Sequence, residues 1–406
     1  MKDNIIIHKP IIEYDDSDSL VLVKVCIEEP GNIRYLWYKV PRQYEQYITM
    51  EVADAFIVAF LLYAMERGLN LRSELPVSSS LLVKLRKYLI PFINYINKDM
   101  MMIDIIATSY KSKFEGEHCG TGISCGVDSL STVVQHGLEE SEISYKIDTL
   151  TLLNTGYYGG ENSSTQYLNF IGRSESFCNN FGFHFMTVDS NIADITGYNF
   201  LSAHTYLTCS TLLLFQKYFR VYYYASGYPV ADFRPVFKDS AYYDIYLLNC
   251  ISTESIDFIS SCCTLSRVDK TRIIANYSDI FSSLYVCVSG NSSHNCSECE
   301  KCIRTMLALE AIRMKERIPD VFNVEIYNKN RIKYISYMLR HRKRSVYYQE
   351  IYNAMKENKV SIPILAYVNI VPCRFEIRRL KNKCKTLLSK FVVGRALINW
   401  VKKAHD

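Results

Sequence analysis

Glycine and proline are scarce in this chain of 406 residues, which holds 16 Gly and 10 Pro. That scarcity excludes a collagen-like or low-complexity protein. A content of 49% hydrophobic and 22% charged residues also excludes an intrinsically disordered chain. The composition therefore predicts a folded protein, and at roughly 150 residues per domain the length predicts about two or three domains.

Long apolar runs are also missing. The longest uninterrupted run, residues 55–65, has 11 residues, whereas a membrane-spanning helix requires about 20. Residues 1–17 carry polar and acidic side chains where a secretory leader has an apolar stretch. We therefore expect no membrane span and a cytoplasmic location.

Charge is distributed unevenly along the chain. The net charge of +5 conceals a basic C-terminal stretch, because residues 329–406 hold 19 Lys and Arg against 4 Asp and Glu, a net of +15. Two dense basic clusters, 340–344 and 378–385, share this stretch with tyrosines and with Trp400. Such clusters can bind nucleic acid. Docking on the acidic remainder of the chain, and binding to a partner protein, are the alternatives.

The N-terminal region combines a hairpin with helices. Residues 20–39 alternate apolar and polar side chains around a Glu-Pro-Gly-Asn turn, which predicts a β-hairpin. Residues 49–65 and 80–90 have helical lengths, and Pro91 is expected to end the second helix. We take residues 1–105 as an accessory domain.

From about residue 102 the pattern changes to short β-branched or aromatic runs separated by helix-length segments. The expected strands are 103–107, 120–124, 149–154, 184–188 and 221–225, and the expected helices are 127–137, 163–181 and 205–218. This alternation predicts an α/β fold, with a parallel sheet and helices on both faces. Ligands of such sheets bind beyond the carboxyl ends of the strands. Functional residues are therefore expected in the loops after residues 124, 154, 188 and 225.

One of these loops has the chemistry of a phosphate site. Residues 122–129, Gly-Ile-Ser-Cys-Gly-Val-Asp-Ser, lead from an expected strand through small residues into an expected helix. Backbone N–H groups at a helix N-terminus bind anions, and the hydroxyls of Ser124 and Ser129 can add donors. Asp128 can hold Mg²⁺ against phosphate oxygens, or it can be a helix-capping carboxylate. A nucleophilic thiol at Cys125 is a further alternative.

Four of the 14 cysteines have the spacing of metal ligands. Cys287, Cys296, Cys299 and Cys302 are separated by eight, two and two residues. Four thiolates can surround Zn²⁺ in a tetrahedron and leave no position for a catalytic water, which predicts a structural Zn²⁺ site. An iron–sulfur cluster and four unrelated buried thiols are the alternatives.

The loop and the cysteines together resemble a known family. Residues 122–129 resemble the SGGxDS loop of the PP-loop ATP pyrophosphatases, with Cys125 in place of the first glycine. The downstream cysteine cluster is similar to that of the 7-cyano-7-deazaguanine synthase (QueC) family within this superfamily. The resemblance covers residues 102–316 and implies ATP and Mg²⁺ besides Zn²⁺. It also implies the nucleotide-binding residues, which are Ser124, Cys125, Gly126, Val127, Asp128 and Ser129.

A third segment supports the resemblance. Residues 226–237, Ser-Gly-Tyr-Pro-Val-Ala-Asp-Phe-Arg-Pro-Val-Phe, resemble the QueC signature SGYPDCRPEF with two extra residues. Here Tyr228 can stack on a flat heterocycle, Asp232 can accept from ring N–H groups, and Arg234 can clamp a carboxylate. The alternative is a tight turn held by an Asp232–Arg234 ion pair. The substrate-binding residues that the resemblance implies are Tyr228, Pro229, Asp232 and Arg234.

Two further segments bear on the phosphates. Residues 266–271 resemble the QueC stretch that begins the helix before the metal cluster, which implies that Lys270 neutralises charge as pyrophosphate leaves. An exposed helix lysine is the alternative. His204 and Thr205 stand where QueC has an Arg-Asn pair; they can donate to a phosphate, or Thr205 can cap the following helix. The catalytic residues implied are Asp128, Lys270 and Arg234.

The resemblance implies a fold and a domain plan. The fold is a PP-loop type α/β domain at residues 106–316 with a four-cysteine zinc subdomain. An N-terminal hairpin-plus-helix domain, 1–105, precedes it, and a basic helical extension, 317–406, follows it. QueC-like proteins with added terminal domains are known in anti-phage defence cassettes, so a defence-system protein is an expected partner.

The implied activity is that of an ATP-dependent carbon–nitrogen ligase. It adenylates a carboxylate of the 7-carboxy-7-deazaguanine class and passes the acyl group to ammonia or to a protein amine, giving a nitrile or an amide. Queuosine biosynthesis and antiviral defence are the expected settings. A non-catalytic nucleotide-binding assembly component and a PP-loop amidotransferase of a glycan pathway are the alternatives.

Overall fold

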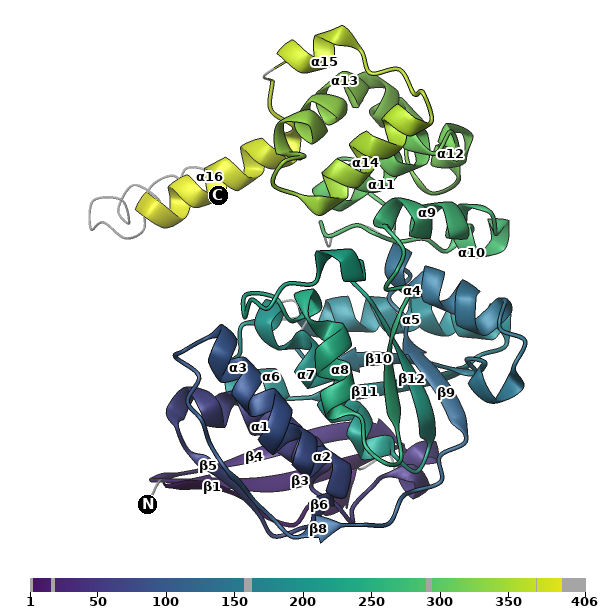
Figure 1. The fold of residues 1–406 in the computed structure, drawn as a ribbon. Coiled ribbons are helices and arrows are strands. Elements are labelled where there is room, and N and C mark those ends of the chain that lie inside the picture. Colours follow the sequence, from purple (N-terminus) through teal and green to yellow (C-terminus); the bar gives the residue numbers. More distant parts are fainter. Residues whose placement is uncertain (1–2, 16–18, 157–162, 290–293, 370, 389–406) are drawn as a thin grey trace, which may run out of the picture. The chain divides into compact units, whose positions relative to one another are not determined.

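The computed structural model describes residues 3–15, 19–156, 163–289, 294–369 and 371–388 (Figure 1). The chain divides into two compact units, Met1–Leu265 and Ser266–Asp406. Trp400 and the rest of the basic stretch beyond residue 388 lie outside the described residues. Within the described residues, no helix combines the length and apolar character that crossing a bilayer requires.

Five parallel strands form one end of the sheet in the first unit. They are β9 (His118–Gly122), β10 (Thr149–Asn154), β11 (His184–Ser190), β12 (Phe219–Ala225) and β13 (Asp257–Ser261). Their order across the sheet is β13-β12-β9-β10-β11, so the first of them in the chain lies in the middle. The expected parallel sheet is confirmed: β10 coincides with its predicted range, three other predictions overlap β9, β11 and β12, and β13 was not predicted.

Helices cover both faces of this sheet. They are α4 (Val127–Val133) with the π-helical turn η3 (Val134–Leu138), α5 (Ser163–Phe181), α6 (Ile192–Thr196), α7 (Phe200–Leu212) and α8 (Asp244–Ile251). Consecutive strand residues point to opposite faces. In β12, Tyr223 stacks on His136 of η3 with ring centroids 3.9 Å apart, whereas the Tyr224 hydroxyl lies 2.7 Å from His204 Nδ1 of α7. The expected covering of both faces is therefore confirmed.

The N-terminal strands belong to the same sheet. They are β1 (Asn4–Ile7), β2 (Ile11–Tyr14), β3 (Leu20–Glu29), β4 (Asn32–Pro41), β5 (Asn70–Ser73) and β7 (Ile105–Ile106). The hairpin of β3 and β4 is confirmed, with a tight turn in which Gly31 has a φ of +78°. β4 pairs with β11, where Tyr38 lies opposite Ser190, and the sheet continues through β3, β1, β5 and β7. This pairing covers an edge of the parallel strands that would otherwise be open.

Pro91 does not end a helix, in contrast to the expectation. α2 (Ser79–Lys84) continues through the π-helical turn η2 (Leu85–Leu89) into α3 (Ile90–Ile96). Pro91 lies inside this continuous helical segment, and the wider π-helical turn before it accommodates the proline ring and its missing N–H. Two short strands, β6 (Val77–Ser78) and β8 (Ser109–Tyr110), pair beside this helix.

One buried core joins the N-terminal region to the parallel strands. Helix α1 (Asp54–Arg67) contains the longest apolar run of the chain, and residues 55–65 are all buried. α1 packs against α7, and one hydrophobic cluster extends from Ile5 to Phe258. Residues 1–105 are therefore part of the first unit, because their strands and α1 share its sheet and its core.

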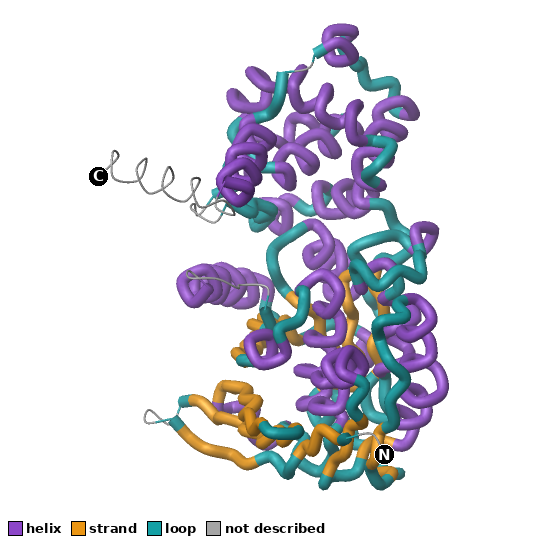
Figure 2. Tube along the Cα trace, turned by 90° about the vertical axis from the view of Figure 1, so that its left-hand side faces the viewer, coloured by secondary structure: helices purple, strands orange, loops and turns teal. Residues whose placement is uncertain are grey.

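The second unit consists of helices and connecting loops, without strands, over its described residues (Figure 2). Its helices are α9 (Arg267–Ala275), α10 (Ser278–Ser282), α11 (Glu300–Ala311), α12 (Ile318–Val321), α13 (Val324–His341), α14 (Val346–Glu357), α15 (Ile364–Val368) and α16 (Arg374–Leu388). α11 packs against α9, α13 and α14. The division at residue 265 therefore differs from the expected boundaries, because the cysteine segment packs with the C-terminal helices.

A buried ion pair fixes α13 on α11. Arg331 Nε lies 2.8 Å from Glu310 Oε1, and Tyr327 also hydrogen bonds to this carboxylate. Glu310 is buried, so these partners compensate the cost of removing its charge from water. The basic cluster 340–344 lies at the end of α13 and 378–385 lies within α16, so the helical form of the extension is confirmed over its described part.

Candidate functional site

The carboxyl ends of β9 and β12 bring two of the predicted segments together. These strands are parallel neighbours, with Thr121 opposite Tyr223. From β9 the chain adds β10 and β11 on one side and β12 and β13 on the other. The place where the strand order reverses is where open α/β sheets bind ligands. Residues 122–129 and 226–237 lead away from this place, so their expected position beyond the strand ends is confirmed.

The loop after β9 is held by its own serines. Ser124 Oγ lies 3.2 Å from Ser129 Oγ and accepts a hydrogen bond from the Gly126 N–H at 3.3 Å. Ser129 Oγ donates to the Gly126 carbonyl at 3.1 Å. Ser124 is exposed and Ser129 is buried, so the loop presents one hydroxyl to solvent and uses the other internally.

Cys125 turns its side chain away from solvent. Its backbone has a φ of +54°, in the left-handed region that favours glycine. The thiol is fully buried, and burial raises its pKa to about 12. Because reactive thiols need a lowered pKa and exposure, this geometry argues against the alternative of a nucleophile at Cys125. Because the Cys125 side chain points inward, it does not cover the backbone groups on the outer face of the loop.

Helix α4 begins directly after this loop. Gly126 is its N-cap residue, Val127 is buried, and Asp128 lies in the first turn. The hydroxyls of Ser131 and Thr132 donate to the carbonyl of Asp128 at 2.9 and 3.0 Å. The alternative of a capping carboxylate at Asp128 is therefore wrong, because Gly126 occupies the cap. The carboxylate is half-buried at the positive end of α4.

The loop after β12 contains the expected aromatic and charged residues. Tyr228 stacks on Tyr242 with ring centroids 4.4 Å apart and planes 9° from parallel. Arg234 Nη2 lies 3.3 Å from Asp232 Oδ1, and its guanidinium lies 5.4 Å from the Tyr242 ring centre. Pro229 precedes a short 3₁₀ turn. The ion pair that we gave as the alternative is thus present, and Arg234 remains half exposed.

The structure joins His204 to residues that the sequence did not single out. His204 Nδ1 lies 2.7 Å from the Tyr224 hydroxyl, and its Nε2 lies 3.2 Å from Asp239 Oδ1. Thr205 is inside α7, because Asn199 caps this helix by accepting from the Leu201 N–H. The predicted cap at Thr205 is therefore wrong. The only signal in the sequence was His204 itself, since its partners are 20 and 35 residues away.

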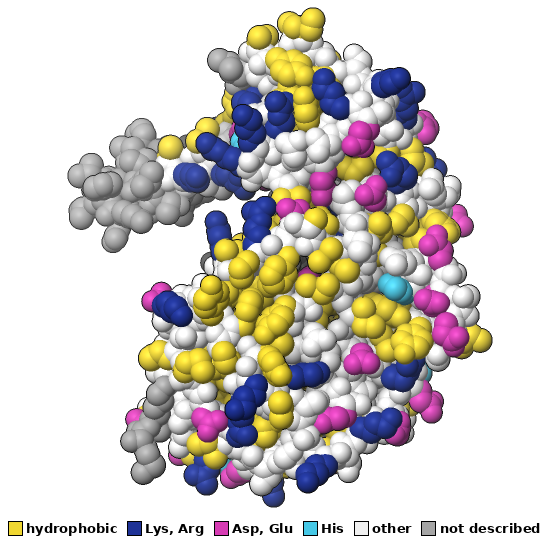
Figure 3. Space-filling view, viewed as in Figure 1, with side chains coloured by type: hydrophobic (Ala, Val, Ile, Leu, Met, Phe, Trp, Pro, Cys, Tyr) yellow, Lys and Arg dark blue, Asp and Glu magenta, His cyan; other side chains and the backbone are white. Residues whose placement is uncertain are grey.

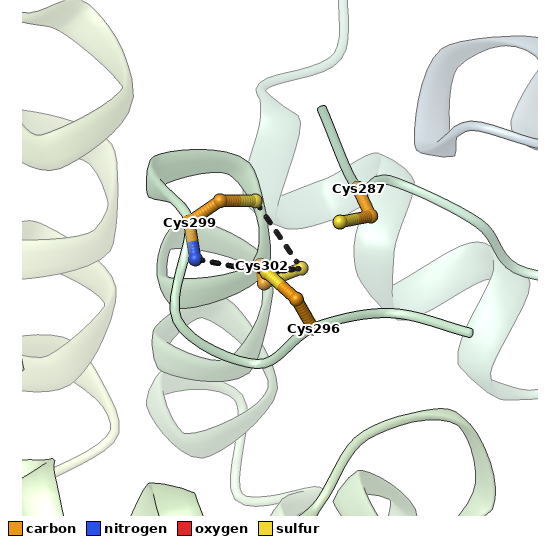
Figure 4. A group of neighbouring side chains, drawn as sticks. All are labelled: Cys287, Cys296, Cys299 and Cys302. Atoms are coloured by element: carbon orange, nitrogen blue, oxygen red, sulfur yellow. Dashed lines mark hydrogen bonds between the residues drawn. The ribbon is translucent and has the colours of Figure 1, made fainter. Parts of the chain in front are cut away.

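The four predicted cysteine ligands come together in the second unit (Figure 4). Their sulfur atoms all lie within 4.8 Å of one another. Cys299 Sγ and Cys302 Sγ are 3.4 Å apart, and Cys296 Sγ and Cys302 Sγ are 3.9 Å apart. A Zn–S bond of about 2.3 Å in a tetrahedron requires sulfur atoms about 3.8 Å apart. The four thiols fit a metal ion such as Zn²⁺, so the alternative of unrelated buried thiols is wrong.

The turn between Cys296 and Cys299 is shaped for thiolate ligands. The Cys299 N–H donates to Cys296 Sγ at 3.2 Å, which helps a sulfur carry negative charge. Ser297 has a φ of +59°, and its carbonyl accepts from the Tyr334 hydroxyl at 3.0 Å. Hydrogen bonds from the other three thiols hold the pKa of Cys287 well below that of an ordinary thiol. The hydrogen bond from Tyr334, a residue of α13, to the Ser297 carbonyl fixes this turn to that helix.

Lys270 lies in the helix before the cysteines. α9 begins with a capping box, in which Asp269 N–H donates to Ser266 Oγ at 3.1 Å and Ser266 N–H donates to Asp269 Oδ2 at 3.2 Å. The helix start predicted from residues 266–271 is confirmed. Lys270 is only 1% exposed, so the alternative of an exposed helix lysine is wrong. Its place beside the phosphates stays a prediction.

Taken together, these features define an α/β protein with a small-residue loop between a parallel strand and the N-terminus of a helix, and with a four-cysteine cluster that could hold a metal ion in a helical unit. Comparisons of the chain with family models, curated proteins and solved structures give no match. The likeness to PP-loop and QueC proteins therefore depends on the residues alone.

Proposed function

We propose that this protein is an ATP-dependent carbon–nitrogen ligase of the PP-loop type. The observation that carries the proposal is the position of residues 122–129, between the middle strand β9 and the N-terminus of α4. Counted along the chain, the parallel strands have the order 3-2-1-4-5, which matches the first five strands of a doubly wound nucleotide-binding sheet of order 3-2-1-4-5-6. An anion held after the first strand lies at the switch point of such a sheet.

The loop supplies what a pyrophosphate group requires. Ser124 is exposed, the α4 N-terminus carries partial positive charge, and the buried side chain of Cys125 leaves the backbone accessible. Asp128, in the first turn of α4, is the residue that would hold Mg²⁺ against phosphate oxygens. Cys125 replaces a glycine without filling the anion position, so it does not argue against ATP binding.

In the proposed reaction a substrate of the 7-carboxy-7-deazaguanine class reacts in two steps, activation and transfer. A carboxylate oxygen attacks the α-phosphorus of ATP, and pyrophosphate leaves. An amine then attacks the acyl carbon, and AMP leaves. Arg234, whose side chain is half exposed, is the residue proposed to hold the substrate carboxylate, and Asp232 and Tyr228 are proposed to contact the heterocycle.

The proposed Zn²⁺ is structural. Four cysteine ligands leave no open position for substrate, so the ion would fix the turn at residues 296–299 and take no part in the chemistry. The acceptor amine is either ammonia, in which case renewed activation and dehydration give a nitrile, or an amine of a defence-system protein. Mass spectrometry of partner proteins for a deazaguanine adduct distinguishes these two acceptors.

Pyrophosphate release tests this function directly. ATP, Mg²⁺ and 7-carboxy-7-deazaguanine should release pyrophosphate with the wild-type protein, and Ser124→Ala should lower the rate about tenfold or more because it removes a phosphate donor. Ser144→Ala is the matched control, since its exposed hydroxyl bonds only to Glu142 in its own turn. ATP binding without pyrophosphate release would favour the non-catalytic assembly component, and release with a sugar acid would favour the glycan amidotransferase.

A further inference from the structure

A tyrosine, a histidine and an aspartate form a continuous hydrogen-bonded chain in the first unit. The Tyr224 hydroxyl lies 2.7 Å from His204 Nδ1, and His204 Nε2 lies 3.2 Å from Asp239 Oδ1. The side chains of His204 and Asp239 are only 17% and 16% exposed. With Asp239 ionised, the Nε2 proton faces the carboxylate, so Nδ1 is the nitrogen that accepts from Tyr224. A proton can therefore pass from the tyrosine through the imidazole.

Neighbouring hydroxyls hold this chain in place. Thr205 Oγ1 donates to the Tyr224 oxygen at 3.3 Å and lies 2.9 Å from Ser240 Oγ. Asp239 Oδ1 also accepts from the Ala241 N–H at 3.0 Å. Desolvation raises the pKa of Tyr224 well above that of an ordinary phenol, so Tyr224 does not ionise by itself and acts only as a carrier. These contacts hold Tyr224 and Asp239, the two hydrogen-bond partners of His204, in place.

The tyrosine end of the chain lies beside the phosphate-type loop. In the β9–β12 pairing Tyr223 lies opposite Thr121, so the next residue, Tyr224, lies beside Gly122 at the start of that loop. A Cβ atom added to Gly122 would lie 3.5 Å from the Tyr222 hydroxyl. Apart from the two neighbouring residues in the chain, no other described residue has an atom within 4 Å of it. Tyr222 and Tyr224 share a face of β12. Gly122 places no side chain of its own between the loop and that face of β12.

We infer that Tyr224, His204 and Asp239 form a proton relay for the amine-transfer step. This inference rests on the proposed ligase function. The relay acts in the second step of that reaction, the transfer of the acyl group to the amine. When the amine nitrogen bonds to the acyl carbon and the bond from that carbon to AMP breaks, the nitrogen must lose a proton. That proton goes to the Tyr224 oxygen while the proton of Tyr224 moves to His204 Nδ1. Asp239, which joins the relay through His204 Nε2, is a positioning residue that stabilises the imidazolium.

Separate assays of the two half-reactions test the relay. Substrate-dependent exchange of pyrophosphate into ATP reports adenylation, and ammonia-dependent AMP release reports transfer. Tyr224→Phe and His204→Gln should leave exchange within about twofold of wild type and lower transfer about 100-fold. Asp239→Asn should lower transfer by a smaller factor. Hydroxylamine, whose less basic nitrogen loses its proton readily to water, should restore transfer in all three variants.

A matched histidine provides the control. His118 pairs with Asp148 at 3.0 Å in the same sheet, but it lies at the amino end of β9. His118→Gln should therefore leave both half-reactions unchanged. Equal losses of exchange and transfer in the His204→Gln variant, or undiminished transfer, would overturn the relay alone. Absence of exchange in the wild-type protein would overturn the proposed function and the relay with it.

Discussion

At the scale of single residues, Cys125 combines an unfavourable backbone conformation with a favourably buried side chain. Its φ of +54° is one that glycine adopts without strain, while its thiol fills a buried position. The left-handed conformation costs a non-glycine residue about 1–2 kcal/mol. Burial of a small apolar side chain returns about 1 kcal/mol. The two terms nearly cancel, which explains why a cysteine is tolerated in a position that favours glycine.

This balance predicts that Cys125→Gly changes the free energy of unfolding by no more than about 1 kcal/mol. Cys125→Val should lose about 1–3 kcal/mol, because a β-branched side chain is strained at positive φ. Urea unfolding of the two variants measures both values. A glycine variant less stable than the valine variant would contradict this account.

Asp54 is a buried carboxyl group with a measurable pH effect. It accepts hydrogen bonds from the Ser78 N–H at 2.8 Å and from Gln216 Nε2 at 2.9 Å, yet desolvation raises its pKa to about 6. A raised carboxyl pKa means that its stabilising contribution is complete below the unfolded pKa near 4 and is lost as pH rises through 6.

The stability difference between wild type and Asp54→Asn should therefore fall by about 2.5 kcal/mol from pH 4 to pH 7, since a pKa shift is worth about 1.4 kcal/mol per unit. Urea unfolding at several pH values measures this difference. A difference that does not change with pH would show that Asp54 is not desolvated in the folded protein.

At the scale of elements, the cysteine turn also anchors the last described helix. Arg374 Nη1 of α16 lies 2.7 Å from Glu298 Oε2, and Arg379 Nη2 lies 3.6 Å from Glu300 Oε2. These two glutamates flank Cys299. Lys and Arg side chains gather on the face of the second unit seen in Figure 3. The anchoring pairs are exposed and weak, so they hold α16 only while the turn keeps its shape.

Removal of the metal should therefore release α16. Chelation, or the Cys302→Ser substitution, should abolish binding of one metal equivalent and speed tryptic cleavage within residues 374–388, because the thiolate-bound turn loses its shape. Cys384→Ser, a substitution at an exposed cysteine of α16 itself, is the matched control and should change neither. Metal analysis and timed proteolysis measure the two effects. Cleavage that does not respond to the metal would contradict the coupling.

At the scale of the whole molecule, the chain divides into two compact units, whereas the sequence predicted three domains. The expected boundary near residue 105 lies inside a continuous sheet, because β4 pairs with β11 and α1 packs on α7. The expected boundary near residue 316 lies inside the helical unit. Neither could be foreseen, since each depends on contacts between segments far apart in the sequence.

Fragments of the chain test this division. The fragment 1–265 should fold and unfold in one cooperative transition, whereas 106–265 should aggregate, because it exposes the β11 edge and the apolar surface that α1 covers. Size-exclusion chromatography and circular dichroism distinguish the two results. A monomeric, folded 106–265 fragment would restore the boundary at residue 105.

The sequence by itself determined the features that local order encodes. Strand β10, helix α5, the β3–β4 hairpin, the position of the loop 122–129 and the four clustered cysteines all follow from the spacing of residues close together in the chain. In each case one local physical requirement, such as side-chain periodicity, turn geometry or tetrahedral coordination, fixes the outcome.

Only the tertiary structure decided the rest. It joined β4 to β11, carried a helix through Pro91, turned Cys125 inward and brought Tyr224 and Asp239 to His204. Each of these depends on which distant segments share a sheet edge or a buried face. Burial of apolar surface over the whole unit decides which distant segments pack together. The spacing of residues along the chain does not contain this information.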